Sequence, residues 1–386
     1  MTMLERIADL PRASRAMSWI VIGLFGLFVL TPATTQMLGL GKRASTENRV
    51  LAAFPQVAGL PDALSVPRRL EAYVNDRFGL RQQMIIAYSW LRLQLGVSSV
   101  KDVAVGTDRW LFYTADKLLE QHTGVNRYAP AELEHWVASM EAIHAWLGKR
   151  GIPFYILIAP DKNTAFPERL PSYPLKAGAS RRLDQLAARM ARSPVPFIDP
   201  RAALAEAKAR GVETYFSGDS HWTEHGALIA YGQLMAKVRE RFPGIVPLQL
   251  SDYERYRGKP MAADLDRLLS LEGILSHEVE RLKLKDASRQ TQPPRMSMRP
   301  GWGWRVEEFT NDLRGAPRIL VFGDSFTTYV MGPNMLYATF RDPVWTHNNG
   351  GTLNMDLVRE FKPDLVVMQM ADRYLLQTPL KAVGLE

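Results

Sequence analysis

Two short segments, far apart in the chain, contain the residue types of a serine nucleophile, a histidine base and a carboxylate that orients the base. Residues 219–222 read Asp-Ser-His-Trp, and residues 323–326 read Gly-Asp-Ser-Phe. A serine hydroxyl becomes an effective nucleophile when a histidine takes its proton and a third group fixes that histidine. The two segments therefore predict an acyl-transfer site in which Ser325 is the nucleophile, His221 the base and Asp219 the orienting group.

The surroundings of Ser325 favour it over the other serine. It follows the apolar run 319–322, which predicts a strand, and it precedes what reads as the first turn of a helix. Its N–H would then lie at a helix N-terminus, where it can bind an oxyanion. Ser220 has no such strand before it. The alternative for the first segment is structural, with Asp219 capping the helix that begins near Thr223 and His221 serving only as a packing residue.

A second polar loop is expected at His347, Asn348 and Asn349, which are followed by two glycines. It is either an active-site loop, with an asparagine amide as oxyanion donor, or an ordinary turn. A metal site formed by Asp219, His221 and His225 is conceivable because histidines four apart can share a helix face. The sequence offers no further ligand set, so neither a metal nor another cofactor is expected.

The elements that must position these residues alternate between helix and strand. The pattern predicts helices at 132–150, 179–192 and 223–242, and strands at 153–159, 195–198, 318–322 and 364–370. Such alternation predicts an α/β domain with a mostly parallel sheet, whose ligands bind beyond the C-terminal ends of the strands. The charged segment 243–312 breaks this alternation and is expected to be an insertion near the site. Within it, Trp302 and Trp304 either stack on sugars or belong to the core.

The N-terminal region predicts attachment to a membrane. No charged residue occurs from Ala16 to Gly41, and about 20 apolar residues suffice to cross a bilayer as a helix. We expect a cytoplasmic tail at 1–15, an uncleaved transmembrane signal anchor at 16–41, and the rest of the chain in the periplasm at the bacterial inner membrane. A cleaved signal peptide is the alternative. Residues 42–98 are expected to form a linker and an amphipathic helical segment with a bend near 75–81.

The amino-acid composition limits the kinds of partner and metal site that the protein can have. The 386 residues carry a net charge of +8 and contain no cysteine, so disulfides and thiolate metal sites are excluded. The positive charge suggests either an anionic surface or polymer as partner, or merely solubility. No zinc spacing, RNP pattern or basic heptad helix is present, so nucleic acid is not an expected partner.

Several strings and their order resemble the SGNH hydrolase-like domain of the bacterial alginate O-acetyltransferase group and its exopolysaccharide relatives. In that group the Asp-x-His block precedes the Gly-Asp-Ser block, which is a permuted order, and this chain has the same order. The strings lie at 47–52, 75–81, 105–112, 160–162, 167–171, 219–222, 323–326 and 372–375.

The resemblance implies an SGNH hydrolase-like three-layer α/β sandwich over 99–380, with Ser325, His221 and Asp219 as its triad. Oxyanion or substrate candidates are Asn348, Asn349, Lys162 and Arg373. Members of the group acetylate polysaccharide outside the cytoplasm beside a membrane-bound O-acyltransferase that supplies acetyl. The resemblance therefore predicts a polysaccharide O-acetyltransferase. The alternatives are a polysaccharide acetylesterase and a non-catalytic, membrane-tethered polysaccharide-binding subunit. The polymer is expected to be either an acidic glycan or a neutral, cellulose-like one.

Overall fold

The computed structural model describes residues 12–38, 50–56, 59, 62, 64–170, 172–174, 176, 179–259, 263–275, 277–298, 305–348, 351–377 and 379–384. Trp302, Trp304 and Asn349 lie outside the described residues, as do 1–11 of the expected tail and 39–41 of the expected anchor. The chain forms two compact units, one of residues 1–95 with 268–271, the other of residues 96–267 with 272–386.

The N-terminal unit contains the helices α2 (Arg12–Met37), α4 (Val66–Arg77) and α5 (Arg81–Gln94). The bend expected near 75–81 is confirmed, because Leu80 has φ 65° and separates α4 from α5. Asp76 Oδ2 accepts the Ala52 N–H at 2.7 Å. The rings of Phe54 and Tyr73 meet edge to face at 5.2 Å. The bond from Ala52 to Asp76 therefore joins the end of the first string of the family pattern to the second string.

The second half of α2 contains threonines, and their hydroxyls bond within the helix. Thr34 Oγ1 donates to the carbonyl of Leu30 at 3.1 Å, and Thr35 Oγ1 donates to that of Thr31 at 2.9 Å. Among the described residues, no helix combines the length and the apolar character needed to cross a membrane. The anchor at 16–41 therefore remains a prediction from the sequence.

A seven-stranded sheet is the centre of the larger unit, and its strands run in the order β4-β3-β12-β9-β10-β8-β7. Neighbours from β4 to β10 are parallel, whereas β8 and β7 are antiparallel to their neighbours. The strands are β3 (Phe154–Ala159), β4 (Phe197–Ile198), β7 (Arg295–Met298), β8 (Arg305–Glu308), β9 (Arg318–Gly323), β10 (Arg341–His347) and β12 (Leu365–Ala371).

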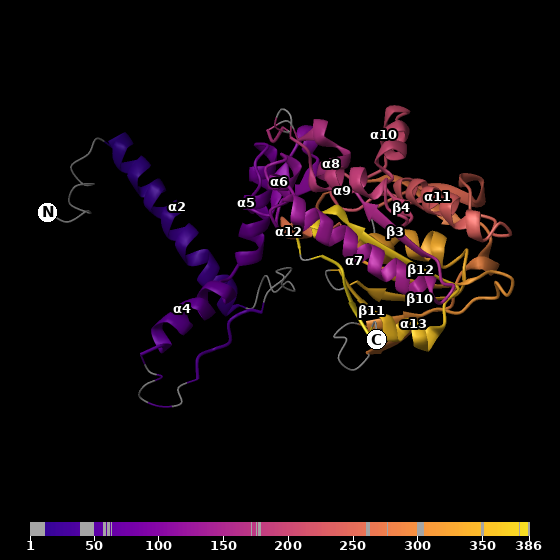
Figure 1. The fold of residues 1–386 in the computed structure, drawn as a ribbon. Helices are drawn as coiled ribbons and strands as arrows, with labels where there is room; N and C mark the ends of the chain where they lie inside the picture. The colour runs from indigo at the N-terminus through magenta and orange to yellow at the C-terminus, as the bar shows by residue number, and fades with distance from the viewer. Residues whose placement is uncertain are drawn as a thin grey trace. The chain divides into compact units, whose positions relative to one another are not determined.

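Helices cover both faces of this sheet (Figure 1). In β9, Ile319 and Val321 point to one core and Leu320 and Phe322 to the other, as the two-residue repeat of a strand requires. The first core also contains α10 (Arg201–Ala209), α11 (Glu224–Arg241) and the π-helix η5 (Thr327–Leu336); the second contains α7 (Pro130–Gly148), α9 (Arg182–Met190) and α13 (Met355–Phe361). This is the three-layer α/β arrangement with a mostly parallel sheet that the sequence predicts.

Smaller elements complete the larger unit. They are β1 (Val103–Val105), η1 (Thr107–Arg109), β2 (Leu111–Tyr113), α6 (Leu118–His122), α8 (Lys162–Ala165), η2 (Pro167–Arg169), η3 (Leu250–Asp252), η4 (Ala287–Arg289), β11 (Thr352–Asn354), η6 (Asp372–Leu376) and β13 (Lys381–Val383). β1 pairs with β2 antiparallel, and β11 pairs with β13 parallel.

The segment 243–312 is not a single insertion. Its first part contains an antiparallel pair, β5 (Tyr253–Gly258) and β6 (Val279–Leu284), with the short helix α12 (Asp264–Leu268) between the two strands. Its last part supplies β7 and β8 to the main sheet. The sequence does not reveal this, because β7 and β8 have four residues each and β7 is largely exposed, so their alternation is weak. We refer below to residues 253–284 as the hairpin insertion.

A buried ion pair joins the hairpin insertion to the core. Arg281 of β6 donates from Nε to Glu224 Oε1 of α11 at 2.5 Å, and both side chains are less than a tenth exposed. A buried charge that loses its partner has no compensation for the loss of water.

We therefore expect Arg281→Met to lower the free energy of unfolding by about 3 to 5 kcal/mol. Arg255→Met on the neighbouring strand is the control, because the Arg255 side chain is 59% exposed and its surface ion pair contributes little. Urea unfolding followed by circular dichroism measures both variants. Equal stability of the two would contradict the structural role of this pair.

Candidate active site

The structure brings the three predicted triad residues into one hydrogen-bonded chain. Ser325 Oγ lies 2.7 Å from His221 Nε2, although the two residues are 104 positions apart. On the other side of the ring, His221 Nδ1 lies 2.6 Å from Asp219 Oδ1. A histidine that holds a serine hydroxyl with one nitrogen and a carboxylate with the other can move the serine proton.

The turn that carries Ser325 is held by the strand beside it. β9 ends at Gly323, and the carboxylate of the next residue, Asp324, accepts the N–H of Phe326 at 2.9 Å and that of Ala371 at 2.6 Å. Gln369 Oε1 in turn accepts the Asp324 N–H at 3.1 Å. Ser325 thus stands at the C-terminal edge of the sheet, and its N–H belongs to the first helical turn, whose amides lack partners within the helix.

The loop that carries His221 is anchored to the nucleophile turn and to α11. Trp222 is fully buried, and its indole Nε1–H donates to the carbonyl of Phe326 at 3.1 Å. Thr223 caps α11, because its hydroxyl accepts the Gly226 N–H at 3.2 Å. Thr223 therefore does the capping that the structural alternative assigned to Asp219.

The buried side chain of Lys162 holds the same loop in place through hydrogen bonds. Its ammonium group donates to three backbone carbonyls, those of Phe216 at 2.9 Å, Ser217 at 3.0 Å and Asp219 at 2.7 Å. These bonds use all three of its protons, which requires the charged form, whereas burial lowers the pKa of Lys162 to about 7. The residue expected to contact substrate or oxyanion therefore positions the base loop instead.

Electrostatics at the triad favours an ionised Asp219. Burial raises the pKa of Asp219, but its bonds from the His221 ring, the His221 N–H and the Asp264 N–H lower it, and the net result is well below the usual range. Burial lowers the pKa of His221, Asp219 and Asp264 raise it, and the net shift is upward. The carboxylate thus stabilises the imidazolium that forms when the base takes a proton.

Asn348 lies at the end of β10, next to the nucleophile strand. Its N–H donates to the Gly323 carbonyl at 3.2 Å, and its side-chain amide donates to the Gln369 carbonyl at 2.9 Å. One of its two amide protons is thus used to hold the strand ends together. An oxyanion role for Asn348 remains a prediction that rests on the other proton.

Arg373 belongs to a buried network at the ends of β3 and β12. Its guanidinium pairs with Asp161, and its N–H donates to Asp161 Oδ2 at 2.8 Å. Asp372 Oδ1 accepts the Asp161 N–H at 3.0 Å. The guanidinium also lies 5.7 Å from the centre of the Phe326 ring, so it approaches the nucleophile turn. These contacts join the strings at 160–162 and 372–375 in space. A substrate role for Arg373 remains a prediction.

Ser325 opens into a cavity of about 410 Å³. The cavity is also lined by Met298, Arg305, Thr328, Tyr329, Trp345 and His347. Its wall thus includes residues of the edge strands β7 and β8 and of β10. The Tyr329 ring meets the His221 ring edge to face at 5.2 Å, so the cavity contains the nucleophile in its wall and a second wall residue that contacts the base.

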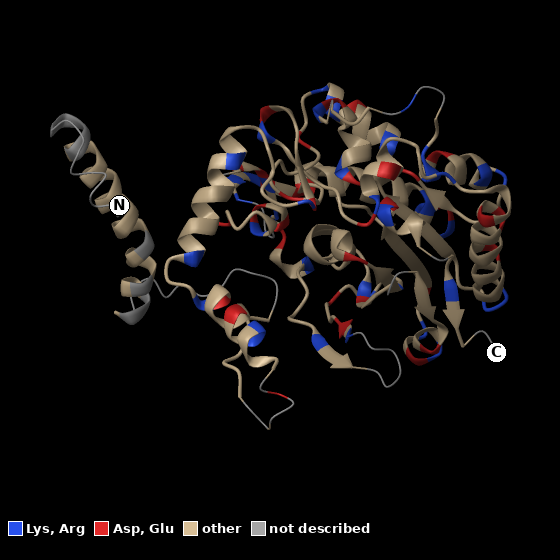
Figure 2. Cartoon of the chain, turned by 90° about the vertical axis from the view of Figure 1, so that its left-hand side faces the viewer, with Lys and Arg blue, Asp and Glu red and all other residues tan. Residues whose placement is uncertain are grey.

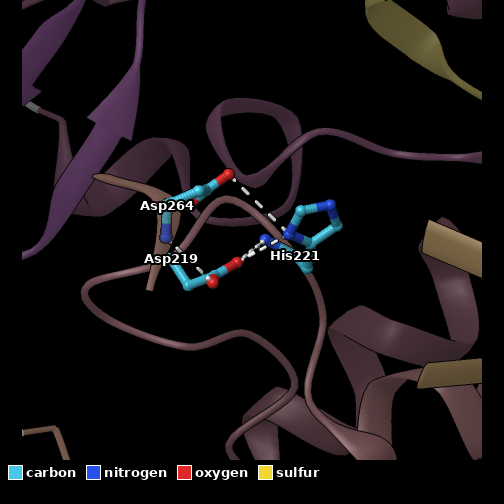
Figure 3. Close-up of side chains that lie close together, drawn as sticks. All are labelled: Asp219, His221 and Asp264. Atoms are coloured by element: carbon cyan, nitrogen blue, oxygen red, sulfur yellow. Dashed lines mark hydrogen bonds and ion pairs between the residues drawn. The ribbon is translucent and has the colours of Figure 1, made fainter. Parts of the chain in front are cut away.

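A fourth residue at the triad, Asp264 of α12, is not predicted by the sequence. Its Oδ2 lies 3.8 Å from His221 Nδ1, on the same side of the ring as Asp219 (Figure 3). Ligand atoms of Asp219, His221 and Asp264 all lie within 4.8 Å of one another. The metal set weighed from the sequence is not assembled, because His225 Nε2 lies 2.8 Å from Glu280 instead.

The fold and the site define a class, an α/β protein of hydrolase-like design with a Ser-His-Asp triad at the C-terminal edge of its sheet. The model of the ALGX family, described as the SGNH hydrolase-like domain of the acetyltransferase AlgX, matches residues 103–357. That match covers more than half of the chain, and the chain belongs to this family.

Individual relatives are more distant. A probable alginate O-acetylase AlgJ of Pseudomonas fluorescens is 25% identical over 54% of this chain and 52% of its own length. A protein of the same name from Pseudomonas syringae pv. tomato is 22% identical over 79% of this chain and 77% of its own. The chain thus spans about half the length of one curated relative and about three quarters of the other.

A solved structure supports the fold. Bacillus cereus PatB1, determined with a sulfonyl adduct, superposes with a TM-score of 0.52 at 14% identity. The superposition covers 71% of this chain and 97% of PatB1.

The upward shift of the His221 pKa predicts the pH dependence of any reaction that uses it as a base. The base must be neutral, so kcat/KM should fall as pH falls through the His221 pKa, with the midpoint above the usual value of about 6.5. A pH–rate profile with an activated acetyl ester measures this. A midpoint at or below 6.5 would contradict the arrangement of Asp219 and His221.

Replacement of Lys162 should disorganise the base loop. Lys162→Met removes the donor of the Phe216 and Asp219 carbonyls and one of the two donors of the Ser217 carbonyl, which also accepts the Leu111 N–H. We expect it to lower the free energy of unfolding by at least about 2 kcal/mol and to reduce activity. Lys149→Met at the exposed end of α7 is the matched control. Thermal unfolding and ester hydrolysis of both variants provide the comparison. A Lys162→Met protein with normal stability and activity would overturn this role.

Proposed function

We propose that this chain is a polysaccharide O-acetyltransferase that works through an acetyl-enzyme on Ser325. The observation that carries the proposal is the continuous chain from Asp219 through His221 to Ser325, open to a cavity at the nucleophile. That the transferred group is acetyl and the acceptor a polysaccharide is supported by membership of the family of the acetyltransferase AlgX and by the relatives named alginate O-acetylase.

The first half-reaction loads the enzyme. His221 Nε2 takes the hydroxyl proton of Ser325 while Oγ attacks the carbonyl carbon of the acetyl donor. The oxyanion that forms is stabilised by the Ser325 N–H and a second amide, for which Asn348 is the candidate. The intermediate collapses, His221 returns its proton to the leaving group, and acetyl remains on Ser325.

The second half-reaction transfers acetyl to a sugar. A sugar hydroxyl enters the cavity, gives its proton to His221 Nε2 and attacks the acetyl carbonyl. Collapse of this intermediate breaks the bond to Ser325 Oγ, which regains the proton from His221. With water as acceptor, the same steps make the chain an acetylesterase, so the product distinguishes the two.

The charge of the glycan, acidic or neutral, is a further part of the proposal. Arg305 at the cavity is paired with Glu307 at 2.6 Å, and Figure 2 shows cationic and anionic residues interspersed over the larger unit. Among the described residues, Figure 2 therefore shows no single cationic cluster that would account for the net charge of +8. We propose an acidic glycan because the relatives are named for alginate.

The setting of the reaction is part of the proposal. A periplasmic location at the bacterial inner membrane, with 16–41 as anchor and a membrane-bound O-acyltransferase as acetyl donor, rests on the sequence and the family resemblance. Fractionation of cells that express the full chain, with protease treatment of spheroplasts, tests the location.

The decisive experiment compares full-length wild type with Ser325→Ala and His221→Ala. Hydrolysis of 4-nitrophenyl acetate should fall at least about a hundredfold in both variants, because each loses the nucleophile or its base. Transfer to acidic and neutral oligosaccharides is followed by mass spectrometry. We expect acetylated oligosaccharide, with the acidic acceptor preferred, from the wild type only.

Exposed residues of the same types supply the controls. Ser251→Ala and His135→Ala remove a serine and a histidine that lie outside the site, and both variants should retain activity. Free acetate without acetylated sugar would identify an acetylesterase. Glycan binding without turnover in the wild type, unchanged by Ser325→Ala, would identify a binding subunit.

A further inference from the structure

Asp264 is a side chain of the hairpin insertion that bonds directly to the base loop. Its Oδ1 accepts the N–H of Ser220 at 2.7 Å, and its Oδ2 accepts the Ser220 hydroxyl at 2.5 Å. Its own N–H donates to Asp219 Oδ2 at 3.2 Å (Figure 3). Asp264 thus holds two consecutive residues of the loop, and it keeps the Ser220 hydroxyl bound and away from the role of nucleophile.

The insertion also contacts the loop just before Asp219, at Ser217 and Gly218. Ser217 Oγ lies 2.8 Å from His277 Nδ1, and His277 Nε2 lies 3.2 Å from Asp266 Oδ1. The Asp266 N–H donates to the Gly218 carbonyl at 3.3 Å. A Cβ at Gly218 would stand 2.5 Å from the His277 ring, so the insertion packs on the loop without space for a side chain.

The backbone around Asp264 is strained in a way that fits a fixed position. Ala263 has φ +44°, a left-handed conformation that costs roughly 1–2 kcal/mol for a residue with a Cβ. Such a conformation persists where surrounding contacts determine it, as they do at functional sites. Here those contacts are the bonds from Asp264 to Ser220 and Asp219.

Charge gives Asp264 a second effect on the base. The charged groups that face His221 are Asp219 from its own loop, Asp264 from the insertion and Arg373 from η6; the rings of Phe326 and Tyr329 pack on the imidazole. Asp264 adds a second negative charge 3.8 Å from Nδ1, where Asp219 already binds. Both carboxylates favour the protonated ring and Arg373 opposes it.

We propose that Asp264 is a positioning residue of the active site, which orients the Asp219–His221 pair and supplies a second carboxylate to the base. The hairpin insertion is by this inference part of the catalytic apparatus and not a surface excursion. The inference rests on the proposed use of His221 as the base for Ser325.

The test separates the charge of Asp264 from its hydrogen bonds. Asp264→Asn keeps an acceptor for the Ser220 N–H and removes the charge, whereas Asp264→Ala removes both. We expect the acid limb of the kcat/KM profile for 4-nitrophenyl acetate to move to lower pH in both variants, because protonated His221 loses a stabilising charge. The plateau rate should fall about tenfold in Asp264→Asn and up to about a hundredfold in Asp264→Ala, as for a displaced catalytic group.

The matched control is Glu254→Gln, which removes an exposed carboxylate from β5 of the same insertion and should change neither the plateau nor the acid limb. Thermal unfolding of each variant is measured alongside. A plateau that falls only together with the melting temperature, with the acid limb unmoved, would reduce Asp264 to a structural residue and overturn the proposal. So would unchanged profiles in both Asp264 variants.

Two further arms keep the outcomes distinct. Ser325→Ala, assayed in parallel, reports on the proposed function itself, so full activity in that variant would remove the basis of this inference and not only its detail. A chelator arm tests a metal-binding role for Asp219, His221 and Asp264. We expect EDTA to leave the wild-type rate unchanged, and loss of activity that Zn²⁺ restores would overturn the positioning role.

Discussion

The active site depends on one buried ammonium group. Lys162 stands at the start of α8, directly beyond β3, and gives its three protons to carbonyls of the base loop. An antiparallel bridge between Tyr215 and Trp222 closes the base of this loop, but the carbonyls within it still need donors, because a buried carbonyl without a donor is costly. Lys162 is the donor for the Phe216 and Asp219 carbonyls and shares the Ser217 carbonyl with the Leu111 N–H, so it holds the backbone on both sides of Gly218 in place for His221. This support, together with the bond from Trp222 to the nucleophile turn, places His221 within hydrogen-bonding distance of Ser325, 104 residues away.

Buried carboxylates play the corresponding part on the strand side of the site. Asp324 accepts backbone N–H groups from its own turn and from β12, and Asp372 does the same for the turn after β3. Burial raises the pKa of each, while bonds from backbone amides lower the pKa of Asp324. The ends of three parallel strands are thereby tied together beneath the nucleophile. The scaffold and the site share the same polar network, so neither can be altered separately.

The sequence predicted the alternation of helices and strands and the three triad residues, because strand ends and residue chemistry are local signals. It did not predict the role of Lys162, since a lysine near a site reads as a ligand until its protons are counted. Asp264 was missed for another reason. It lies in a charge-rich stretch where an acidic residue carries no information, and its partners are more than 40 positions away. β7 was missed because a short, exposed edge strand has almost no pattern.

The two antiparallel edge strands have a consequence for how such an enzyme diversifies. Met298 of β7 and Arg305 of β8 line the cavity, yet neither strand takes part in the network that holds Ser325 and His221. Their outer side chains face water, so mutations there should have little effect on the stability of the fold. They would mainly change which acceptor fits the cavity. Under the proposed function, substitutions at this rim of the sheet would change the choice of acceptor while the centre that holds Ser325 and His221 stays intact.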